Sequence, residues 1–463
     1  MKLFVKLAHR FLLCLVSVAT IAPASSAFAA DSPPLEAGLA VRDITPDGPI
    51  WLAGYSARNK PSEKVDSPLL VQACALKSGD ERIVLVSLDN CEVSREFMAP
   101  VLEEMNRDFG LKPGAVMVVS SHTHSAPVLE GPLAPMYNLS GANLDAVRTY
   151  GQFLRVKLVE VVRAALADLK PAQLAHGVGR ATFAMNRRVY KDDRVDFGEN
   201  PDGPADHDVP VLRITAPDGT VRAILFGYAC HGTSIAGDDF YFVSGDYMGY
   251  ARQHLEAHYP GAAALYFTGM GADSNPSPRG RLLDAKRHGL ELAGAVASVL
   301  DRPLRPVRGA LRLAYAEMDL PLEDNPSREL LEKDAKGDDF HIRNRATAWL
   351  KLLGEGKPLP KSVKLPLSAV RIGDDLTFVA MGGEVVVDYG IRFKRLFAAD
   401  HLWLIGYAYE VPCYIPSVRI LKEGGYEAQS SLIYYGIYGP FRAQVEGLLV
   451  KKMTELVEAV RGK

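Results

Sequence analysis

Two histidines, His122 and His124, stand two positions apart where an apolar run over residues 115–119 ends in small polar residues and a proline. A continuous run rich in β-branched residues is typical of a buried parallel strand, and catalytic side chains favour the loop that follows such a strand. In extended backbone the two rings point to the same face. Both can then bind a metal ion, or one binds it while the other handles protons. The motif alone leaves open a polar strand end whose histidines bond only to backbone.

Further polar clusters follow other apolar runs along the chain. They are His231, the pair Asp273 and Ser274, Glu384, and a tyrosine-rich stretch over residues 407–426. Two imidazoles and a carboxylate form an oxygen and nitrogen donor set that suits zinc. These residues are far apart in sequence, so only the fold can bring them together. Taken alone, Glu384 has a second interpretation, because an acidic residue before a helix also caps it.

Strand and helix patterns alternate along the chain, which predicts an α/β fold of mixed sheets with flanking helices and with the metal site at strand ends. Antiparallel hairpins are expected around residues 78–80, 218–219 and 373–375. The polar stretch over residues 190–208 is interpreted as a surface loop, and residues 325–353 as one charged helix. No repeat and no convincing domain boundary is visible. The length of 463 residues suits one large domain or two smaller ones.

The N-terminus has the pattern of a signal peptide over residues 1–29. A positive start (Lys2, Lys6 and Arg10) precedes an apolar stretch over residues 11–22 and a small-x-small site at residues 27–29. We therefore expect an exported protein, periplasmic or secreted, whose mature chain starts at Ala30. The apolar stretch is too short for a membrane span, and no other run is long enough.

The composition argues against nucleic acid as a partner and against a zinc site made of cysteines. The chain is 48% hydrophobic and 23% charged with a net charge of −2, an ordinary globular composition without a basic run, which argues against nucleic acid as a partner. The mature cysteines show no CxxC spacing, so a cysteine zinc site is not expected. They are Cys74, Cys91, Cys230 and Cys413. Export permits a disulfide between Cys74 and Cys91, but the sequence does not assign one.

An ordered set of motifs resembles the neutral/alkaline (non-lysosomal) ceramidases. The resemblance runs from about residue 36 to the end of the chain. Its motifs are residues 40–45 (AVRDIT), 54–55 (GY), 121–127 (SHTHSAP), 186–187 (NR), 230–234 (CHGTS), 245–247 (GDY), 383–384 (GE), 414–415 (YI) and 426–427 (YE). No single motif is decisive, but the order of the motifs and the spacing between Tyr414 and Tyr426 argue against a chance match.

The resemblance implies one zinc ion per chain, held by His122, His231, Glu384 and Tyr414. It implies that His124, Arg187 and Tyr426 face the substrate amide, and Ser274 aligns with a serine proposed to act in catalysis. The family hydrolyses the amide of ceramide to sphingosine and a fatty acid. Tyr414 is implied by the resemblance alone. Other tyrosines, among them Tyr407 and Tyr435, are interpreted as core or pocket wall, and one of the adjacent Arg187 and Arg188 as solvated.

The sequence also departs from the family pattern. Residues 271–276 read GADSNP where the family has GDVSPN, Ala126 replaces a glycine, and Gly382 replaces a proline. The chain is expected to consist of the catalytic domain over residues 30–463 without the C-terminal β-sandwich domain of full-length enzymes, which bears on contact with membrane lipid. The substrate is thus an N-acyl lipid or another small amide, with peripheral membrane contact allowed. Two alternatives stand beside ceramide hydrolysis. They are a zinc hydrolase of a different amide or ester, and a non-catalytic binding protein on the same fold.

Overall fold

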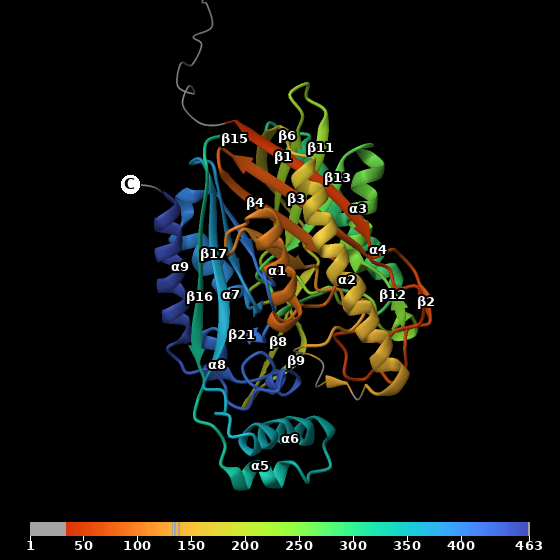
Figure 1. The fold of residues 1–463 in the computed structure, drawn as a ribbon, viewed down its shortest axis with the longest axis vertical. Coiled ribbons are helices and arrows are strands. Elements are labelled where there is room, and N and C mark those ends of the chain that lie inside the picture. Colours follow the sequence, from red (N-terminus) through yellow and green to blue (C-terminus); the bar gives the residue numbers. More distant parts are fainter. Residues whose placement is uncertain (1–33, 132, 134–135, 138, 462–463) are drawn as a thin grey trace, which may run out of the picture. The chain divides into compact units, whose positions relative to one another are not determined.

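The computed structural model describes residues 34–461 apart from 132, 134, 135 and 138. The predicted signal peptide lies outside the described residues. The fold is mixed α/β, as the sequence predicts, with three larger sheets and several short strand pairs (Figure 1).

The first sheet carries the HxH strand at its edge. Its strand order is β5-β4-β3-β1-β6. The strands are β1 (Leu35–Asp43), β3 (Leu70–Ser78), β4 (Glu81–Leu88), β5 (Val116–Ser120) and β6 (Lys170–Pro171). Helices α1 (Arg95–Phe109) and α2 (Gly141–Ala167) cover its outer face (Figure 1). Because side chains alternate along a strand, Val116 and Val118 pack with these helices while Met117 and Val119 face the centre of the molecule.

The second sheet has the strand order β13-β11-β10-β7-β15 and carries the run that leads to His231. Its strands are β7 (Gln173–Arg180), β10 (Asp208–Thr215), β11 (Val221–Tyr228), β13 (Ala263–Thr268) and β15 (Arg305–Val307). Helices α3 (Asp246–His258) and α4 (Leu282–Leu300) pack on its outer face.

The third sheet has the order β16-β17-β18-β20 and leads to Glu384. Its strands are β16 (Leu311–Pro321), β17 (Ser362–Ile372), β18 (Leu376–Met381) and β20 (Leu402–Ile405). Helix α9 (Val445–Arg461) lies along β16 and β17, and the core on that side also contains residues of α7 (Val387–Leu396) (Figure 1).

The inner faces of the three sheets share one core. Met117 of the first sheet, Leu225 of the second and Phe378 of the third belong to the same buried cluster. Each sheet is therefore covered on both faces, which explains why β5, β11 and β18 are continuous apolar runs in the sequence. The C-terminal ends of β5, β11 and β18 lie close together at the edge of this shared core.

The remaining helices and strands lie outside the three larger sheets. They are β2 (Lys64–Val65), β8 (Ala184–Lys191), β9 (Arg194–Asn200), β12 (Phe242–Val243), β14 (Ser274–Pro276), β19 (Glu384–Val385), β21 (Tyr414–Ile415), α5 (Arg328–Asp334), α6 (Phe340–Gly354), α8 (Val418–Glu423), and the 3-10 turns η2 (Gly237–Asp239), η3 (Ala398–Asp400) and η4 (Ser430–Tyr435).

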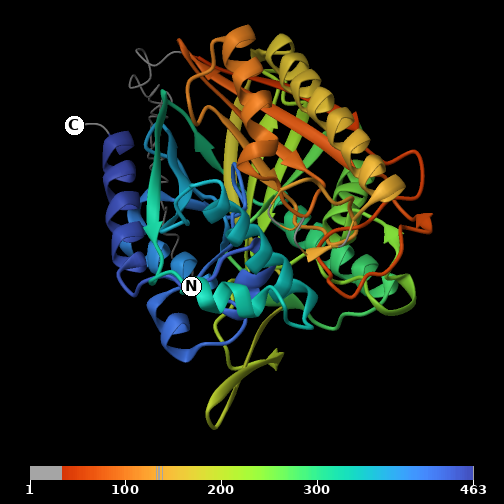
Figure 2. The ribbon, with the colours of Figure 1, turned by 60° about the horizontal axis from the view of Figure 1, so that its bottom comes forward.

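Two sequence interpretations are wrong. Residues 190–208 are not a loop throughout, because β8 and β9 pair as an antiparallel hairpin that projects beyond the sheets (Figure 2). The hairpin is largely solvated, so its strands lack the apolar alternation that signals a half-buried strand. Residues 325–353 form two helices, because the Asp339 side chain accepts a hydrogen bond from Ile342 N and starts α6 anew. Cys74 and Cys91 are both buried free thiols.

Candidate metal centre

Backbone pairing at the strand ends brings the predicted residues together. Thr123, which follows β5, forms a parallel bridge with Gly232, which follows β11, and this places the HxH segment beside His231. In the short parallel pair β19–β21, Glu384 lies opposite Tyr414. The four predicted ligands are almost completely buried, each less than 5% exposed.

The backbone at His122 differs from the prediction. His122 has a φ of 59°, in the left-handed region, so the HxH segment is not extended. The two rings still meet, with their Nε2 atoms 3.1 Å apart. A non-glycine residue in this conformation is held there by its surroundings, and His122 N donates to Asn90 O.

The donor atoms of His122, His231, Glu384 and Tyr414 converge. Nε2 of His122 and Nε2 of His231 each lie 3.1 Å from Glu384 Oε2, and His231 Nε2 lies 3.1 Å from the Tyr414 hydroxyl. Ligands at about 2.0–2.1 Å around a tetrahedral zinc ion are roughly 3.3 Å apart. The spacing of these atoms therefore suits a zinc ion.

The protonation of His122 supports the same conclusion. Its Nδ1 lies 2.8 Å from the carbonyl oxygen of Cys91, an acceptor, so Nδ1 carries the ring hydrogen and Nε2 presents its lone pair. That lone pair faces Glu384 Oε2, which is also an acceptor. Two buried acceptors at 3.1 Å repel each other unless a proton or a metal ion lies between them.

The charges of the cluster are set by burial and by its neighbours. Burial opposes ionisation of Glu384, but His122 and His231 beside it hold the pKa of its carboxyl well below the usual range. Burial and the Arg187 charge lower the pKa of His231 to about 3, and burial with the other two histidines lowers the pKa of His124 well below its usual value. A neutral His231 ring and an ionised Glu384 carboxylate are the forms that bind a divalent metal.

A second grouping of Cys91, His122 and His124 is also compact enough to hold a metal ion. It is the weaker candidate, because His122 Nδ1 is engaged by the Cys91 carbonyl. Burial also raises the pKa of the Cys91 thiol well above its usual value, and a thiol binds metal as the thiolate.

Arg187 is central to the cluster. Its Nη2 donates to the Tyr414 hydroxyl at 3.0 Å, its Nη1 lies 3.1 Å from His231 Nε2, and its Nε donates to Glu427 at 2.8 Å. Burial raises the pKa of Tyr414 well above its usual value, while the Arg187 charge opposes that shift. The guanidinium therefore favours negative charge on the Tyr414 oxygen.

Arg188 corrects another interpretation, because both adjacent arginines are buried. Arg188 Nη1 donates to Glu427 at 2.6 Å, on the opposite carboxylate oxygen from Arg187. A register shift between Asn186 and Arg188 in β8 accompanies this arrangement. The ion pairs with Glu427 offset the desolvation cost of burying the two cations.

The other predicted catalytic residues lie at different depths. Tyr426 packs its ring 5.4 Å from that of Tyr414, and the Arg187 guanidinium lies 5.5 Å from the Tyr426 ring. Ser274 is fully buried, and its backbone oxygen accepts from His231 N. Its Oγ has no hydrogen-bond partner among the described residues. The structure thus shows no base in contact with Ser274.

Several contacts of the cluster come from residues that the sequence did not single out. Tyr407 donates to Glu384 Oε2 at 3.3 Å, and its ring lies 4.4 Å from that of His122. Tyr435 donates to Glu384 Oε1 at 2.5 Å. The Tyr55 ring lies 4.8 Å from that of His124. Of these three tyrosines only Tyr55 belongs to a motif of the family resemblance, Gly54–Tyr55. In the structure a Cβ atom on Gly54 would clash with His124.

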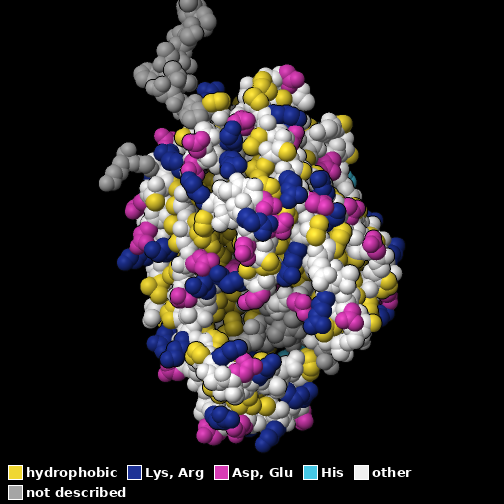
Figure 3. Space-filling view, in the orientation of Figure 1, with side chains coloured by type: hydrophobic (Ala, Val, Ile, Leu, Met, Phe, Trp, Pro, Cys, Tyr) yellow, Lys and Arg dark blue, Asp and Glu magenta, His cyan; other side chains and the backbone are white. Residues whose placement is uncertain are grey.

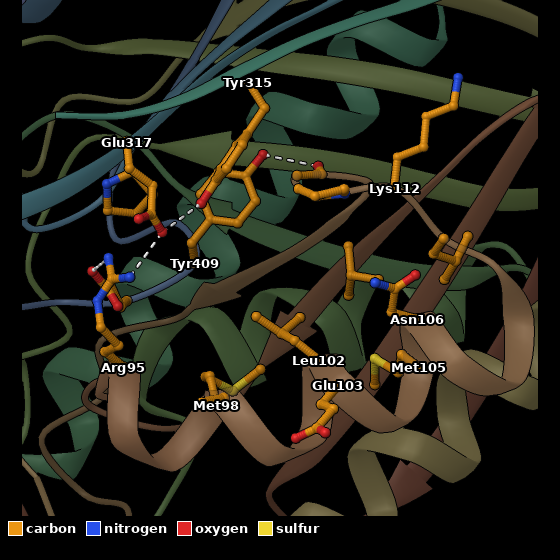
Figure 4. Close-up of a pocket in the computed structure, with 17 residues that line it drawn as sticks. Arg95, Met98, Leu102, Glu103, Met105, Asn106, Lys112, Tyr315, Glu317 and Tyr409 are labelled. Carbon is orange, nitrogen blue, oxygen red and sulfur yellow. Dashed lines mark hydrogen bonds and ion pairs between the residues drawn. The ribbon is translucent and has the colours of Figure 1, made fainter.

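A larger cavity lies apart from this cluster. It has a volume of about 720 Å³ between α1 and the β16–β17 strands and is lined by apolar side chains such as Met98 and Leu102 (Figure 4). At its mouth Arg95 pairs with Glu317 at 2.8 Å and with Glu410 at 2.6 Å. Figure 3 shows hydrophobic side chains in this region with charges of both signs around them. The described residues that line this cavity include no histidine or cysteine, so the candidate metal chemistry stays with the histidine cluster.

With this geometry in view, comparisons with known proteins identify the class. A family profile described as neutral/alkaline non-lysosomal ceramidase, N-terminal, matches residues 35–272. The chain belongs to this family.

Individual relatives agree. Neutral ceramidase A of Dictyostelium discoideum is 25% identical over 247 residues, which cover 52% of this chain and 34% of that protein. The chain therefore spans about a third of the length of this curated relative. The crystal structure of neutral ceramidase from Pseudomonas aeruginosa has a TM-score of 0.71 at 20% identity, covering 93% of this chain and 75% of that one. A ceramidase complexed with C2 has a TM-score of 0.69 at 19% identity, with the same coverage. These structures show that the fold is shared.

Proposed function

We propose that this protein is a zinc-dependent hydrolase that cleaves the N-acyl amide bond of ceramide or of a related N-acyl lipid. The observation that carries the proposal is the buried set of His122, His231 and Glu384, in which two acceptor atoms face each other at a distance that suits one zinc ion. Tyr414 completes a four-ligand set. Membership of the ceramidase family supplies the substrate class.

Zinc bound in such a site polarises a carbonyl and lowers the pKa of a coordinated water. The protein's own residues supply the rest. His124 Nε2 lies 3.1 Å from His122 Nε2, beside the proposed ligands, which supports a role in moving a proton to the leaving amine. Arg187 holds its charge inside the cluster and can stabilise negative charge that develops on the carbonyl oxygen. Tyr426 lies beside Arg187 and is a second candidate for that role.

Aromatic side chains beside the cluster favour an apolar acyl substrate. The Tyr55 ring contacts both His124 and Phe240, at centroid distances of 4.8 and 5.0 Å. On the other side the Phe197 ring of the β8–β9 hairpin lies 5.6 Å from Tyr426. Pockets walled by aromatic rings around a few polar groups are typical of sites for apolar ligands.

The substrate can be tested directly. Purified zinc-loaded protein would be assayed on ceramides of different acyl length, on N-acyl amino acids and on a simple acyl ester. We expect turnover of ceramide, with the short N-acyl amino acids hydrolysed at least about tenfold more slowly because they bury less apolar area. Turnover of the ester or of the N-acyl amino acids without ceramide would keep the hydrolase and discard the lipid.

The cellular location is a separate proposal. The N-terminal pattern over residues 1–29 supports export to the periplasm or the medium. Among the described residues, no helix is long and apolar enough to cross a membrane. Fractionation of cells that express the full chain, with mass determination of the N-terminus, would test export and cleavage before Ala30.

A further inference from the structure

The two carboxylate oxygens of Glu384 have different partners. Oε2 faces the histidines, at 3.1 Å from each of His122 Nε2 and His231 Nε2. Oε1 accepts a hydrogen bond from the Tyr435 hydroxyl at 2.5 Å. Because Tyr435 engages Oε1, only Oε2 remains directed at the donor cluster.

Tyr435 has a second carboxyl partner. Its hydroxyl lies 3.2 Å from Glu92 Oε2, and Glu92 is 5% exposed. A phenol has a single hydrogen, and the shorter contact assigns it to Glu384. The Tyr435 oxygen can then only accept from Glu92, which requires a protonated Glu92 carboxyl.

The position of Tyr435 depends on helix α6. Tyr435 is the last residue of η4, and the next two carbonyl groups are held by α6 side chains. Trp349 Nε1 donates to Gly436 O at 2.8 Å, and Arg345 Nη1 donates to Ile437 O at 2.9 Å. The segment that carries Tyr435 is therefore anchored to α6 immediately beyond the tyrosine.

We propose that Tyr435 is a positioning residue that fixes Glu384 as a single-oxygen metal ligand, and that Glu92 aligns Tyr435 while α6 anchors it. The proposal rests on the zinc site proposed above. Its physical basis is the orientation of a metal ligand by an outer hydrogen bond, the loss of which typically costs about 10- to 100-fold in metal affinity.

The direct test compares Tyr435→Phe with Tyr434→Phe. Tyr434 is the adjacent tyrosine, whose ring packs against His341 at 5.1 Å and which makes no contact with Glu384 among those observed in the described residues. Zinc dissociation constants would be measured by competition with a chromogenic chelator, and the thermal midpoint of each metal-free protein would be measured beside them. We expect Tyr435→Phe to weaken zinc binding about 10- to 100-fold relative to Tyr434→Phe. Equal zinc affinities of the two variants would overturn the proposal.

Substitutions at Glu92 separate alignment from mere packing. In Glu92→Gln the amide N–H can still donate to the Tyr435 oxygen, whereas Glu92→Leu fills similar space without a donor. We expect Glu92→Gln to keep its zinc affinity within about threefold of wild type. We expect the zinc affinity of Glu92→Leu to fall nearly as far as that of Tyr435→Phe. Equal loss in the two Glu92 variants would show that Glu92 only fills space and would contradict its proposed role.

Zinc binding by the wild-type protein separates a failure of the proposed function from a failure of the role proposed for Tyr435. A wild-type protein that binds no zinc would overturn the proposed function itself. A wild-type protein that binds zinc tightly, together with a Tyr435→Phe variant of equal affinity, would overturn only this inference.

Discussion

At the scale of single residues, Arg187 makes the largest number of contacts with the cluster. Its three guanidinium nitrogens reach Glu427, His231 and Tyr414. A lysine can keep the charge but cannot present donors in this fixed fork. We therefore expect that replacing Arg187 lowers the activity strongly even when the new side chain keeps the positive charge.

We predict that Arg187→Lys lowers kcat/KM by about 10²-fold, because the donor to Tyr414 and the charge near the carbonyl oxygen are displaced. Arg188→Lys is the matched control, since Arg188 shares Glu427 and is buried but makes no contact with Tyr414 among those observed. Steady-state kinetics on zinc-loaded proteins would measure the effect. Equal losses in the two variants would assign Arg187 to structure alone.

Gly54 is needed for a different reason. It has a φ of +92°, and a Cβ atom built on it would lie 2.2 Å from His124 Nδ1. We predict that Gly54→Ala displaces His124 and lowers kcat by about 10²-fold while the zinc content is unchanged. Gly48→Ala, where a Cβ meets nothing within 4 Å, is the control. Gly54→Ala with wild-type kcat would argue against a catalytic role for His124.

At the scale of elements, Asp273 joins the loop after β13 to the start of α7. Its Oδ1 accepts from Val387 N at 2.8 Å and its Oδ2 accepts from Asn186 Nδ2 at 3.1 Å. Burial, with Glu427 and Asp388 nearby, raises the pKa of Asp273 to about 6 although the Val387 N–H favours the ionised form. The carboxyl is thus easier to protonate in the folded protein than in the unfolded chain.

This shift predicts a pH dependence of stability. A folded-state pKa above the unfolded value of 3.8 stabilises the fold fully below pH 4, and the contribution is lost as pH rises through 6. Asp273→Asn removes the titrating group. Between pH 4 and pH 7, wild type should lose about 2 kcal/mol more unfolding free energy than Asp273→Asn, as measured by urea denaturation. Parallel pH curves for the two proteins would contradict this assignment.

The elements also show what could be predicted from sequence. The apolar runs of β5, β11 and β18 are covered on both faces, so their patterns are strong. The run over residues 115–119 lies within one residue of the bounds of β5 (Val116–Ser120). The β8–β9 hairpin was missed because it lies outside the core, where no apolar periodicity marks a strand. The break between α5 and α6 was missed because its signal is one capping residue, Asp339, within a charged stretch.

The same reasoning applies to the candidate site. His122, His231 and Glu384 could be proposed because each follows an apolar strand, and strand ends in one α/β fold gather at one place. Tyr414 came only from the family resemblance, since the residues 407–426 contain several tyrosines with no local feature to separate them. Tyr407 and Tyr435 contact distant parts of the chain, and no short motif encodes such contacts. Glu427 lies in the quoted motif over residues 426–427, but the motif does not show that it pairs with Arg187 and Arg188.

At the scale of the whole molecule, three sheets share one core and place their strand ends around the proposed metal ligands. His122 follows β5 of the first sheet, His231 follows β11 of the second, and Glu384 follows β18 of the third. The site therefore depends on how all three sheets pack. A bound zinc ion would in turn link them, and should raise the stability of the fold by mass action.

The most direct test of this account is the zinc content of purified protein, measured together with ceramide hydrolysis, in wild type and His122→Ala. We predict close to one zinc ion per wild-type chain with ceramide turnover, and the loss of both in His122→Ala while the variant stays folded. Wild-type protein that is folded but holds no zinc and hydrolyses no amide, even after incubation with zinc, would contradict the account.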